Sequence, residues 1–318
     1  MDEVLVRIRA AALNRLDLWM ATGLPHVTPV FPFIVGSDGA GVVEQAGPDA
    51  GPWRPGDRVM INPGLSCGRC PACAEGEESL CREFRLLGEH LPGTAAEYLV
   101  VPASALAPVP EGMSWAQAAG FSLVTLTAWR MLAGRARLRA GETALIWGIG
   151  GGVALAALQI ALLLGARALV TSGTDAKLET GRRLGATAGF NHHRDDVVAE
   201  VRRLTDGRGA DVVVDSVGER TWTSSLRALR RGGRMVVCGA TTGPAASFDL
   251  RRLFWHQWSI LGSTMGSRRE YAEIVRLAHQ GRLWPTVDRV VPLADGAAAY
   301  RRLQQGEQTG KLVLEVSS

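Results

Sequence analysis

The sequence predicts an α/β protein in which a doubly wound parallel sheet is inserted into a β-rich domain. Three observations lead to this fold class. Short β-like runs separated by Gly and Pro fill the first hundred residues. From residue 142 to residue 238, strands and helices alternate around a glycine cluster, which is typical of a parallel sheet with right-handed crossovers. The last fifty residues return to a mixed pattern.

The β-rich part is expected to contain four strands, at residues 3–10, 41–44, 58–61 and 96–101. Helical periodicity follows over residues 114–132, with Ser114 as a plausible N-cap. The alternating part predicts these strands and helices in turn: strand 142–147, helix 153–164, strand 168–171, helix 175–184, strand 211–215, helix 221–230 and strand 233–238. The tail predicts helix 270–279, strand 289–291, helix 294–304 and strand 311–316.

These elements divide the chain into three segments. Residues 1–121 form a β-rich domain with a cysteine lobe at about residues 62–90, residues 122–266 form the parallel-sheet domain, and residues 267–318 return to the first domain.

The composition is that of a globular protein and excludes several function classes. Of its 318 residues, 47% are hydrophobic and 21% are charged, with a formal net charge of +4. No apolar stretch reaches the ~20 residues that a membrane span needs. The arginines are scattered, so nucleic-acid binding is not expected. The first residues are charged and carry no apolar signal region, so we expect a cytoplasmic protein.

Four cysteines are the most specific motif. Cys67, Cys70, Cys73 and Cys81 have the spacing C-x2-C-x2-C-x7-C. Four thiolates can surround one tetrahedral Zn²⁺ and leave no position for substrate, so the motif predicts one structural zinc per chain. The alternative is disulfide pairing, which suits short secreted chains better than this one. Cys238 stands alone in an apolar run and is expected to be a buried thiol.

A glycine-rich turn predicts a dinucleotide site. Gly150, Gly151, Gly152 and Val153 lie between a predicted strand and a predicted helix. Glycines allow the backbone to approach a pyrophosphate, and the helix N-terminus supplies N–H donors. The alternative is a purely structural βα turn.

The end of the second strand predicts which dinucleotide binds. An acidic residue there would bind the ribose hydroxyls of NAD, but the position holds the small neutral Ser172. Lys177, one of only two lysines in the chain, follows on the next helix. Asp175 argues for NAD, although it is placed as the N-cap of that helix. The sequence therefore favours NADP(H), with NAD possible.

Taken together, these features resemble the medium-chain dehydrogenase/reductase superfamily over essentially the whole chain. The resemblance rests on the four-cysteine lobe, the glycine turn, and the segments 11–17 (AALNRLD), 36–41 (GSDGAG), 55–59 (PGDRV), 123–129 (LVTLTAW) and 310–311 (GK). It implies a Rossmann domain inserted in a GroES-like catalytic domain. The lobe is similar to that of zinc alcohol dehydrogenases, and the rest is similar to quinone oxidoreductases.

The chain departs from the resemblance at the catalytic zinc. The positions of the family's Cys, His and Cys ligands match Asn14, Ser37 and Leu123, which are poor zinc ligands or none. The sequence therefore predicts no catalytic zinc. The alternative is a second metal held by Asp38, Glu89 and His90, and without metal His90 is simply a loop residue.

The resemblance also implies roles for single residues. Asn14 and Thr127 would contact the nicotinamide and the substrate, Asp17 would orient backbone, and Lys311 would stabilise the fold. The ring pocket would be lined by Gly239, Ala240 and Ser263, and Val217 would lie on the adenosine side. His192 either touches the 2′-phosphate of NADPH or belongs with His193 to an exposed pair.

The resulting expectation is an NADPH-dependent oxidoreductase, a homodimer, that transfers hydride to a quinone, an enone or another activated carbonyl. The alternatives are an alcohol dehydrogenase with atypical zinc ligands, acting on alcohols or aldehydes, and a nucleotide-binding protein without turnover. The resemblance further implies that a strand–turn–strand usual before residue 3 is missing, which would leave an unpaired strand edge.

Overall fold

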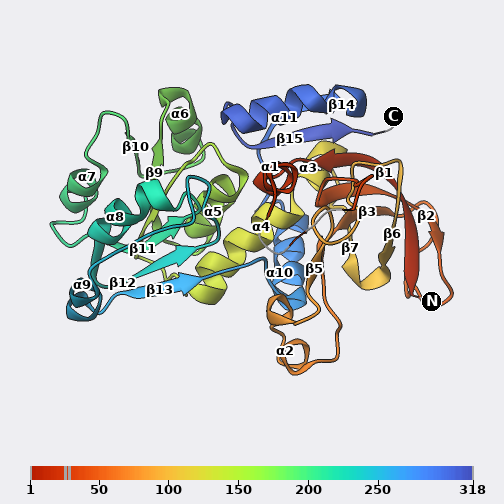
Figure 1. Cartoon of the computed structure of the whole chain (residues 1–318), viewed down its shortest axis with the longest axis horizontal. Coiled ribbons are helices and arrows are strands. Elements are labelled where there is room, and N and C mark those ends of the chain that lie inside the picture. The colour runs from red at the N-terminus through yellow and green to blue at the C-terminus, as the bar shows by residue number, and fades with distance from the viewer. Residues whose placement is uncertain (1, 25–26, 28–29, 317–318) are drawn as a thin grey trace. The chain divides into compact units, whose positions relative to one another are not determined.

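The protein is known from a computed structural model that describes residues 2–24, 27 and 30–316. The chain divides into two compact units (Figure 1). The first consists of Met1–Leu126 and Met265–Ser318, and the second consists of Thr127–Thr264.

The first unit is built on a seven-stranded sheet with the order β14-β15-β1-β2-β3-β7, and β6 pairs with β1. Its strands are β1 (Glu3–Ala12), β2 (Asp38–Ala46), β3 (Arg58–Ile61), β6 (Tyr98–Pro102), β7 (Leu106–Pro108), β14 (Val287–Pro292) and β15 (Lys311–Glu315), with a separate pair β4 (Gly64–Leu65) and β5 (Arg85–Leu86). Its helices are α1 (Arg15–Thr22), α2 (Pro71–Ala74), α3 (Trp115–Ala119), α10 (Arg268–His279) and α11 (Gly296–Gln305), together with most of α4 (Ser122–Trp129).

Strand β1 organises this sheet because it is paired along both sides. It runs antiparallel to β2 on one side, and on the other side it pairs first with β6 and then with β15. Val4, Val6 and Ile8 alternate into the core, as expected for a strand with one buried face. The outer side of β6 has no partner among the described strands, and its Tyr98 and Val100 are exposed.

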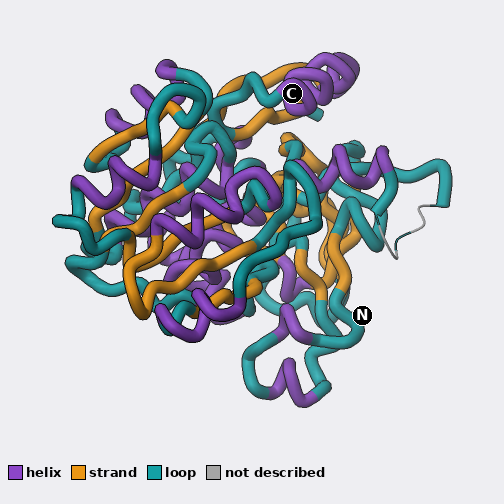
Figure 2. Tube along the Cα trace, turned by 60° about the vertical axis from the view of Figure 1, so that its left-hand side comes forward, coloured by secondary structure: helices purple, strands orange, loops and turns teal. Residues whose placement is uncertain are grey.

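The second unit contains a six-stranded parallel sheet with the order β10-β9-β8-β11-β12-β13. Its elements are a π-helical turn at Arg130–Arg135, β8 (Thr143–Ile146), α5 (Gly152–Leu163), β9 (Arg167–Ser172), α6 (Asp175–Arg183), β10 (Ala188–Asn191), α7 (Val197–Arg203), β11 (Ala210–Asp215), α8 (Glu219–Ala228), β12 (Leu229–Val237), α9 (Leu250–His256) and β13 (Ser259–Gly262). Figure 2 shows these strands as a twisted layer between helices.

The strand order and burial of this sheet confirm the predicted doubly wound fold. In chain order the strands read 3-2-1-4-5-6, the arrangement of dinucleotide-binding folds. All residues of β8 and β11 are buried, because helices cover both faces of such a sheet. The order reverses between β8 and β11, and ligands bind at the carboxyl ends of strands at such a point.

The prediction of one long helix at residues 114–132 is wrong, because the structure has separate helices there. Ser114 does cap a helix, since its side chain accepts a hydrogen bond from the backbone of Gln117, but α3 ends at Ala119 and α4 begins at Ser122. The break falls at Gly120, where a Cβ atom would lie 3.2 Å from Cγ of Lys311. The side chain of Lys311 passes close to this break, and a larger residue at position 120 would need it to shift by a few tenths of an ångström. The elements that were not predicted are helices α1, α2, α7 and α9 and strands β4, β5, β7, β10 and β13.

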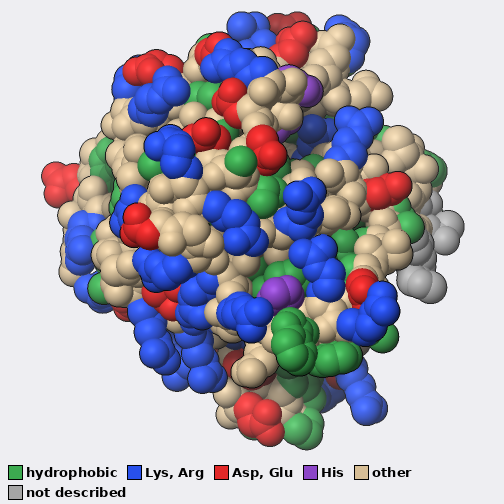
Figure 3. Space-filling model, turned by 90° about the vertical axis from the view of Figure 1, so that its left-hand side faces the viewer, with side chains coloured by type: hydrophobic (Ala, Val, Ile, Leu, Met, Phe, Trp, Pro, Cys, Tyr) green, Lys and Arg blue, Asp and Glu red, His purple; other side chains and the backbone are tan. Residues whose placement is uncertain are grey.

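Two compositional expectations can be followed in the structure. Among the described residues, no helix has both the length and the apolar character needed to cross a bilayer. On the face drawn in Figure 3, Lys and Arg side chains are spread among acidic and neutral ones and do not form a single stripe.

Candidate functional site

The four predicted zinc ligands lie together in one lobe of the first unit. Among the described residues, the sulfur atoms of Cys67, Cys70, Cys73 and Cys81 form the one group suited to hold a metal ion, and all lie within 4.8 Å of one another. The Sγ–Sγ distances are 3.5 Å for Cys70–Cys73, 3.5 Å for Cys67–Cys81 and 4.0 Å for Cys67–Cys73. A tetrahedral zinc with bonds near 2.3 Å requires about 3.8 Å, so the sulfur positions fit Zn²⁺.

The local backbone explains this geometry. Helix α2 begins at Pro71, and Cys70 is its N-cap, so the chain turns sharply between the second and third ligands. The backbone N–H groups of Cys67 and Glu83 point at Sγ of Cys81. N–H groups of Arg69 and Cys70 lower the pKa of the Cys67 thiol to about 7, which favours the thiolate that zinc needs.

The cysteine lobe is attached to helix α10. The carboxylate of Glu78 accepts a hydrogen bond of 3.3 Å from the backbone of Arg268, the first residue of α10. An acidic group at a helix N-terminus is favourable. We therefore expect a change in the shape of the lobe to weaken the contact of Glu78 with the first residue of α10.

A second polar group lies buried where the resemblance places the catalytic zinc. Nζ of Lys311 donates to Oδ1 of Asn14 at 2.5 Å and to Oδ2 of Asp38 at 2.9 Å. Nδ2 of Asn14 donates to the same Asp38 oxygen at 3.0 Å, and to the carbonyl of Ala12 at 3.4 Å. Lys311 is 3% exposed and Asp38 is completely buried. The three side chains form a closed ammonium–amide–carboxylate cluster.

Asp17 supports this cluster from helix α1. Its carboxylate accepts hydrogen bonds from the backbone N–H groups of Asn14, at 2.7 Å, and Gly36, at 2.9 Å. The prediction that Asp17 orients backbone is thus confirmed. Burial raises the pKa of Asp17 to about 6, although the two N–H donors and Lys311 act in the opposite direction.

The donor set around Lys311 does not fit a zinc ion. Ser37 is fully buried with an unpartnered hydroxyl, and Leu123 contributes only its backbone N–H, which donates to Asp38 at 2.8 Å. Zinc prefers thiolate, imidazole and carboxylate, and an ammonium already occupies the polar centre. The alternative set of Asp38, Glu89 and His90 does not converge either, since the cysteines are the one suitable group in the described part of the chain.

The glycine turn of the second unit has the form of a phosphate-binding loop. It follows β8 and leads into α5, whose N-cap is Gly151 and whose first residues are Gly152 and Val153. Gly148 adopts a positive φ of 72°, which glycine tolerates best, and its N–H donates to Thr171. A Cβ atom on Gly150 would lie 2.6 Å from Cδ of Lys177, so this lysine lies directly over the turn.

Two further loops meet at the same edge of the sheet. The loop after β11 contains Val217, and the loop after β12 contains Gly239 and Ala240; Thr242 joins them by donating its backbone and hydroxyl groups to the carbonyl of Val217. Asp215, at the end of β11, accepts hydrogen bonds from the backbone of Val217 and Gly218. The sheet therefore brings the predicted residues of three loops to its carboxyl edge.

The end of β9 corrects one prediction. Thr174, not Asp175, is the N-cap of α6. Asp175 is the first helical residue, and its carboxylate pairs with Arg194 at 2.8 Å and accepts from Asn191 at 3.3 Å. Ser172 is buried, and its hydroxyl accepts from the backbone of Thr174. The acidic group is thus engaged by an arginine that sequence reasoning missed.

The remaining predicted residues lie in α4 and in the loops after β10, β12 and β13. Thr127 is buried in α4 and belongs to the second unit, and Ser263 follows β13 with a buried, unpartnered hydroxyl. Cys238, directly after β12, is half-buried as a residue, and burial raises the pKa of its thiol to about 12. His192 and His193 are both exposed and lie against each other, with ring centroids 4.7 Å apart.

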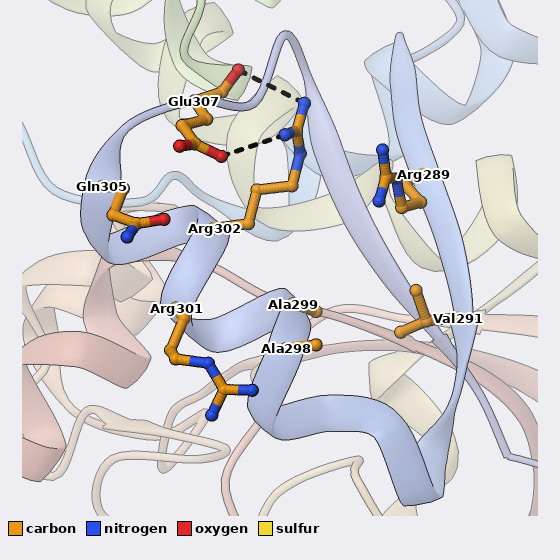
Figure 4. A pocket seen from close by; sticks show the side chains of 8 residues that line it. All are labelled: Arg289, Val291, Ala298, Ala299, Arg301, Arg302, Gln305 and Glu307. Carbon is orange, nitrogen blue, oxygen red and sulfur yellow. Dashed lines mark hydrogen bonds and ion pairs between the residues drawn. The ribbon is translucent and has the colours of Figure 1, made fainter.

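A surface pocket in the first unit involves none of these residues. It lies between β14 and α11 and is drawn in Figure 4. Arg302 is held there by Asp288 at 2.9 Å and Glu307 at 3.2 Å, and Arg301 points away from this pair (Figure 4). These contacts join α11 to β14 and indicate a structural role.

The chain is similar to known proteins over almost its whole length. Residues 1–111 match the alcohol dehydrogenase GroES-like domain, and residues 152–280 match the zinc-binding dehydrogenase family. The chain is 32% identical over 318 residues to an alcohol dehydrogenase of Geobacillus stearothermophilus, covering 99% of this chain and 92% of that protein. It is also 32% identical to a crotonyl-CoA reductase of Streptomyces avermitilis, covering 96% and 78%.

The structure gives the same result. A crystal structure of an NAD-dependent alcohol dehydrogenase superimposes with a TM-score of 0.95 and 43% identity, covering 99% of this chain and 92% of that chain. The similarity therefore includes both units, and it is close enough to define the family as well as the fold.

Proposed function

Because the chain belongs to the medium-chain dehydrogenase/reductase superfamily of NAD(P)-dependent oxidoreductases, we propose that it is an NADPH-dependent reductase of quinones, enones or other activated carbonyl compounds. One structural zinc in the cysteine lobe belongs to this proposal, and a catalytic zinc does not. A cytoplasmic homodimer, with the segments 1–121, 122–266 and 267–318 as its domains, completes it.

The observation that carries the proposal is the buried cluster of Lys311, Asn14 and Asp38. Oxidising an unactivated alcohol requires something to lower the pKa of its hydroxyl, and in zinc enzymes the metal does so. Here an ammonium ion fills the polar centre, 2.5 Å from Asn14 and 2.9 Å from Asp38. A substrate that is already electrophilic has less need of a Lewis acid and depends on positioning and hydrogen-bond donors.

Asn14 is the proposed donor on the side of the first unit. Its Nδ2 atom carries two hydrogens, one held firmly by Asp38 at 3.0 Å and one held loosely by the carbonyl of Ala12 at 3.4 Å. The second hydrogen is the one that Asn14 can donate in a hydrogen bond to a substrate oxygen as negative charge develops there. Lys311 polarises the amide through Oδ1 and makes that hydrogen a better donor.

The cofactor residues of the second unit complete the proposal. When bound, the nicotinamide supplies the hydride. Gly150, Gly151, Gly152 and Val153 offer the turn and helix N-terminus for its pyrophosphate, and Thr127 and Ser263 would contact its ring. The choice of NADPH is supported by Lys177 over the glycine turn and by Asp175, which Arg194 already neutralises.

The relatives support two substrate classes. The crotonyl-CoA reductase carries in its name an activated alkene, a class that includes enones. The alcohol dehydrogenases favour the runner-up, a dehydrogenase of alcohols or aldehydes, and one of them is named NAD-dependent. In the described part of the chain the carboxylates that contact Asn14, those of Asp38 and Asp17, are engaged by Lys311 and by backbone N–H groups, which supports a mechanism without a metal.

The test is steady-state oxidation of NADPH and NADH with quinones, enones, enoyl thioesters and aldehydes, and reduction of NADP and NAD with alcohols. Metal analysis of the same sample should find about one zinc per chain. Faster turnover of alcohols than of every activated substrate, or a second zinc per chain, would overturn the proposal. Tight cofactor binding with no turnover of any substrate would indicate a nucleotide-binding protein.

A further inference from the structure

Two histidines lie over the residue that follows the second strand of the parallel sheet. The site that a Cβ atom on Gly173 would occupy is 2.7 Å from Nε2 of His193 and 3.4 Å from Nε2 of His192. Both ring nitrogens therefore converge on one spot. The rings meet edge to face, with an interplanar angle of 62°.

This spot is where a doubly wound sheet reads the adenosine ribose. Strand β9 ends at Ser172, which pairs with Asn191 of β10, and the backbone of His192 donates to the Ser172 carbonyl at 3.0 Å. The end of the second strand is the place at which a 2′-hydroxyl or a 2′-phosphate is distinguished. The histidine pair is thus built into the specificity position itself.

The charged groups around the pair are already partnered. On α6, Asp175 pairs with Arg194, and Lys177 lies over Gly150. On the loop after β10, Arg194 also contacts Asp195, whose other oxygen accepts from the backbone of Asn191. Asp196 caps α7, and Trp147 on the glycine turn is uncharged. Arg194 thus serves two carboxylates, and among the described residues neither imidazole of the pair makes an ion pair with a carboxylate.

We propose that the His192–His193 pair makes the choice between NADPH and NADH depend on pH, with the preference for NADPH weakening as pH rises. This inference rests on the proposed function for the presence of NADPH at the site. A protonated imidazole at this spot offers positive charge and two N–H donors to a 2′-phosphate, whereas a neutral imidazole offers one donor and no charge.

The direction follows from proton linkage. Partial removal from water lowers the pKa of His192, and the neighbouring His193 lowers it further, so this imidazole binds a proton less readily before a phosphate is present. A bound phosphate dianion favours the charged imidazole, so binding takes up a proton and tightens as pH falls. The uncharged 2′-hydroxyl of NADH at the same place does not favour the charged imidazole, so its binding takes up no proton. Below about pH 6 the phosphate itself takes up a proton, so a further fall in pH no longer tightens its binding.

The experiment is calorimetric binding of adenosine 2′,5′-bisphosphate and of 5′-AMP to the full chain at pH 8.0 and 6.5. Neither probe requires turnover. We expect the bisphosphate to bind about tenfold more tightly at pH 6.5, as for uptake of about two-thirds of a proton over this range, and 5′-AMP to change by less than about twofold.

Variants distinguish the histidines from other charges. His192→Asn and His193→Asn, singly and together, should flatten the pH dependence of bisphosphate binding, with circular dichroism to verify folding. Lys177→Met should weaken binding by about the same factor at both pH values, because lysine does not titrate in this range. His279→Asn, an exposed histidine on α10, is the matched control and should behave like the wild type.

A bisphosphate affinity that is independent of pH, or a pH dependence that survives in the double variant, would overturn the inference. So would failure of the bisphosphate to bind at either pH. Because binding is measured without substrate, a pH-dependent affinity in a protein that reduces no quinone or enone would keep the inference and reject the proposed function. Conversely, NADPH-dependent turnover together with a bisphosphate affinity that is independent of pH would keep the proposed function and reject the inference.

Discussion

The ammonium of Lys311 lies 2.5 Å from the amide oxygen of Asn14, although 297 residues separate them in the chain. The contact joins β15 to the residue that caps α1, and Asp38 at the start of β2 closes the group. A buried charge of this kind is stable only with its partner, because removal from water costs several kcal/mol. The contact therefore couples the fold of the first unit to its proposed chemistry.

Lys311→Met should be strongly destabilising. It leaves the completely buried carboxylate of Asp38 without its cation, and breaking a buried pair typically lowers the free energy of unfolding by about 3–5 kcal/mol. Urea unfolding at pH 7 measures this change in the free energy of unfolding. Arg208→Met, at an exposed position, is the control and should stay within about 0.5 kcal/mol of the wild type. Equal stability of the two variants would mean that the cluster does not hold the fold.

Asp17 should make part of the stability depend on pH. Its folded pKa of about 6 lies above the ordinary value of 3.8, so between about pH 6 and pH 4 the folded protein takes up a proton that the unfolded chain does not. Protonation then favours folding, and stability linked to Asp17 rises as pH falls, by up to about 3 kcal/mol.

Comparison with Asp17→Asn isolates that effect, because the change of zinc affinity with pH is common to both proteins. Relative to the variant, the wild type should gain free energy of unfolding as the pH is lowered from 7 to 5. A constant difference between the two proteins over this range would show that Asp17 does not titrate there.

Cys70→Ser should remove the zinc and loosen the lobe without abolishing hydride transfer. The variant keeps three thiolates, and the Glu78–Arg268 contact that ties the lobe to α10 should weaken. We expect zinc content to fall from about one equivalent per chain to near zero, with faster proteolysis between residues 62 and 90. Cys238→Ser should keep its zinc. Complete loss of activity in a folded Cys70→Ser protein would indicate that this metal is catalytic.

Arg194→Gln should weaken the preference for NADPH. The substitution releases Asp175 from its ion pair of 2.8 Å and places a free carboxylate beside the ribose position. We expect KM for NADPH to rise about tenfold, which corresponds to ~1.4 kcal/mol, and KM for NADH to fall or stay unchanged. The double variant Asp175→Asn/Arg194→Gln should recover NADPH binding in part. An unchanged ratio of the two KM values would argue against Asp175 as the group that distinguishes the cofactors.

Much of the architecture could be predicted because local patterns carry it. Strands alternating with helices around a glycine cluster predicted the parallel sheet, and a C-x2-C-x2-C-x7-C spacing predicted four sulfur atoms that do meet. The errors fell where a distant residue decides the local structure. The break at Gly120 lies against the side chain of Lys311, and the ion pair of Asp175 depends on Arg194, 19 residues away.

By itself the sequence determined the fold class, the zinc lobe and the position of the dinucleotide turn, since each depends on residue types at short and fixed spacing. Only the tertiary structure decided which polar groups share a buried environment. Lys311, Asn14 and Asp38 lie on three separate segments, and Gly173 meets His192 and His193 across two neighbouring strands. Charge pairing in a buried site depends on distances in space, and sequence separation does not reveal those distances.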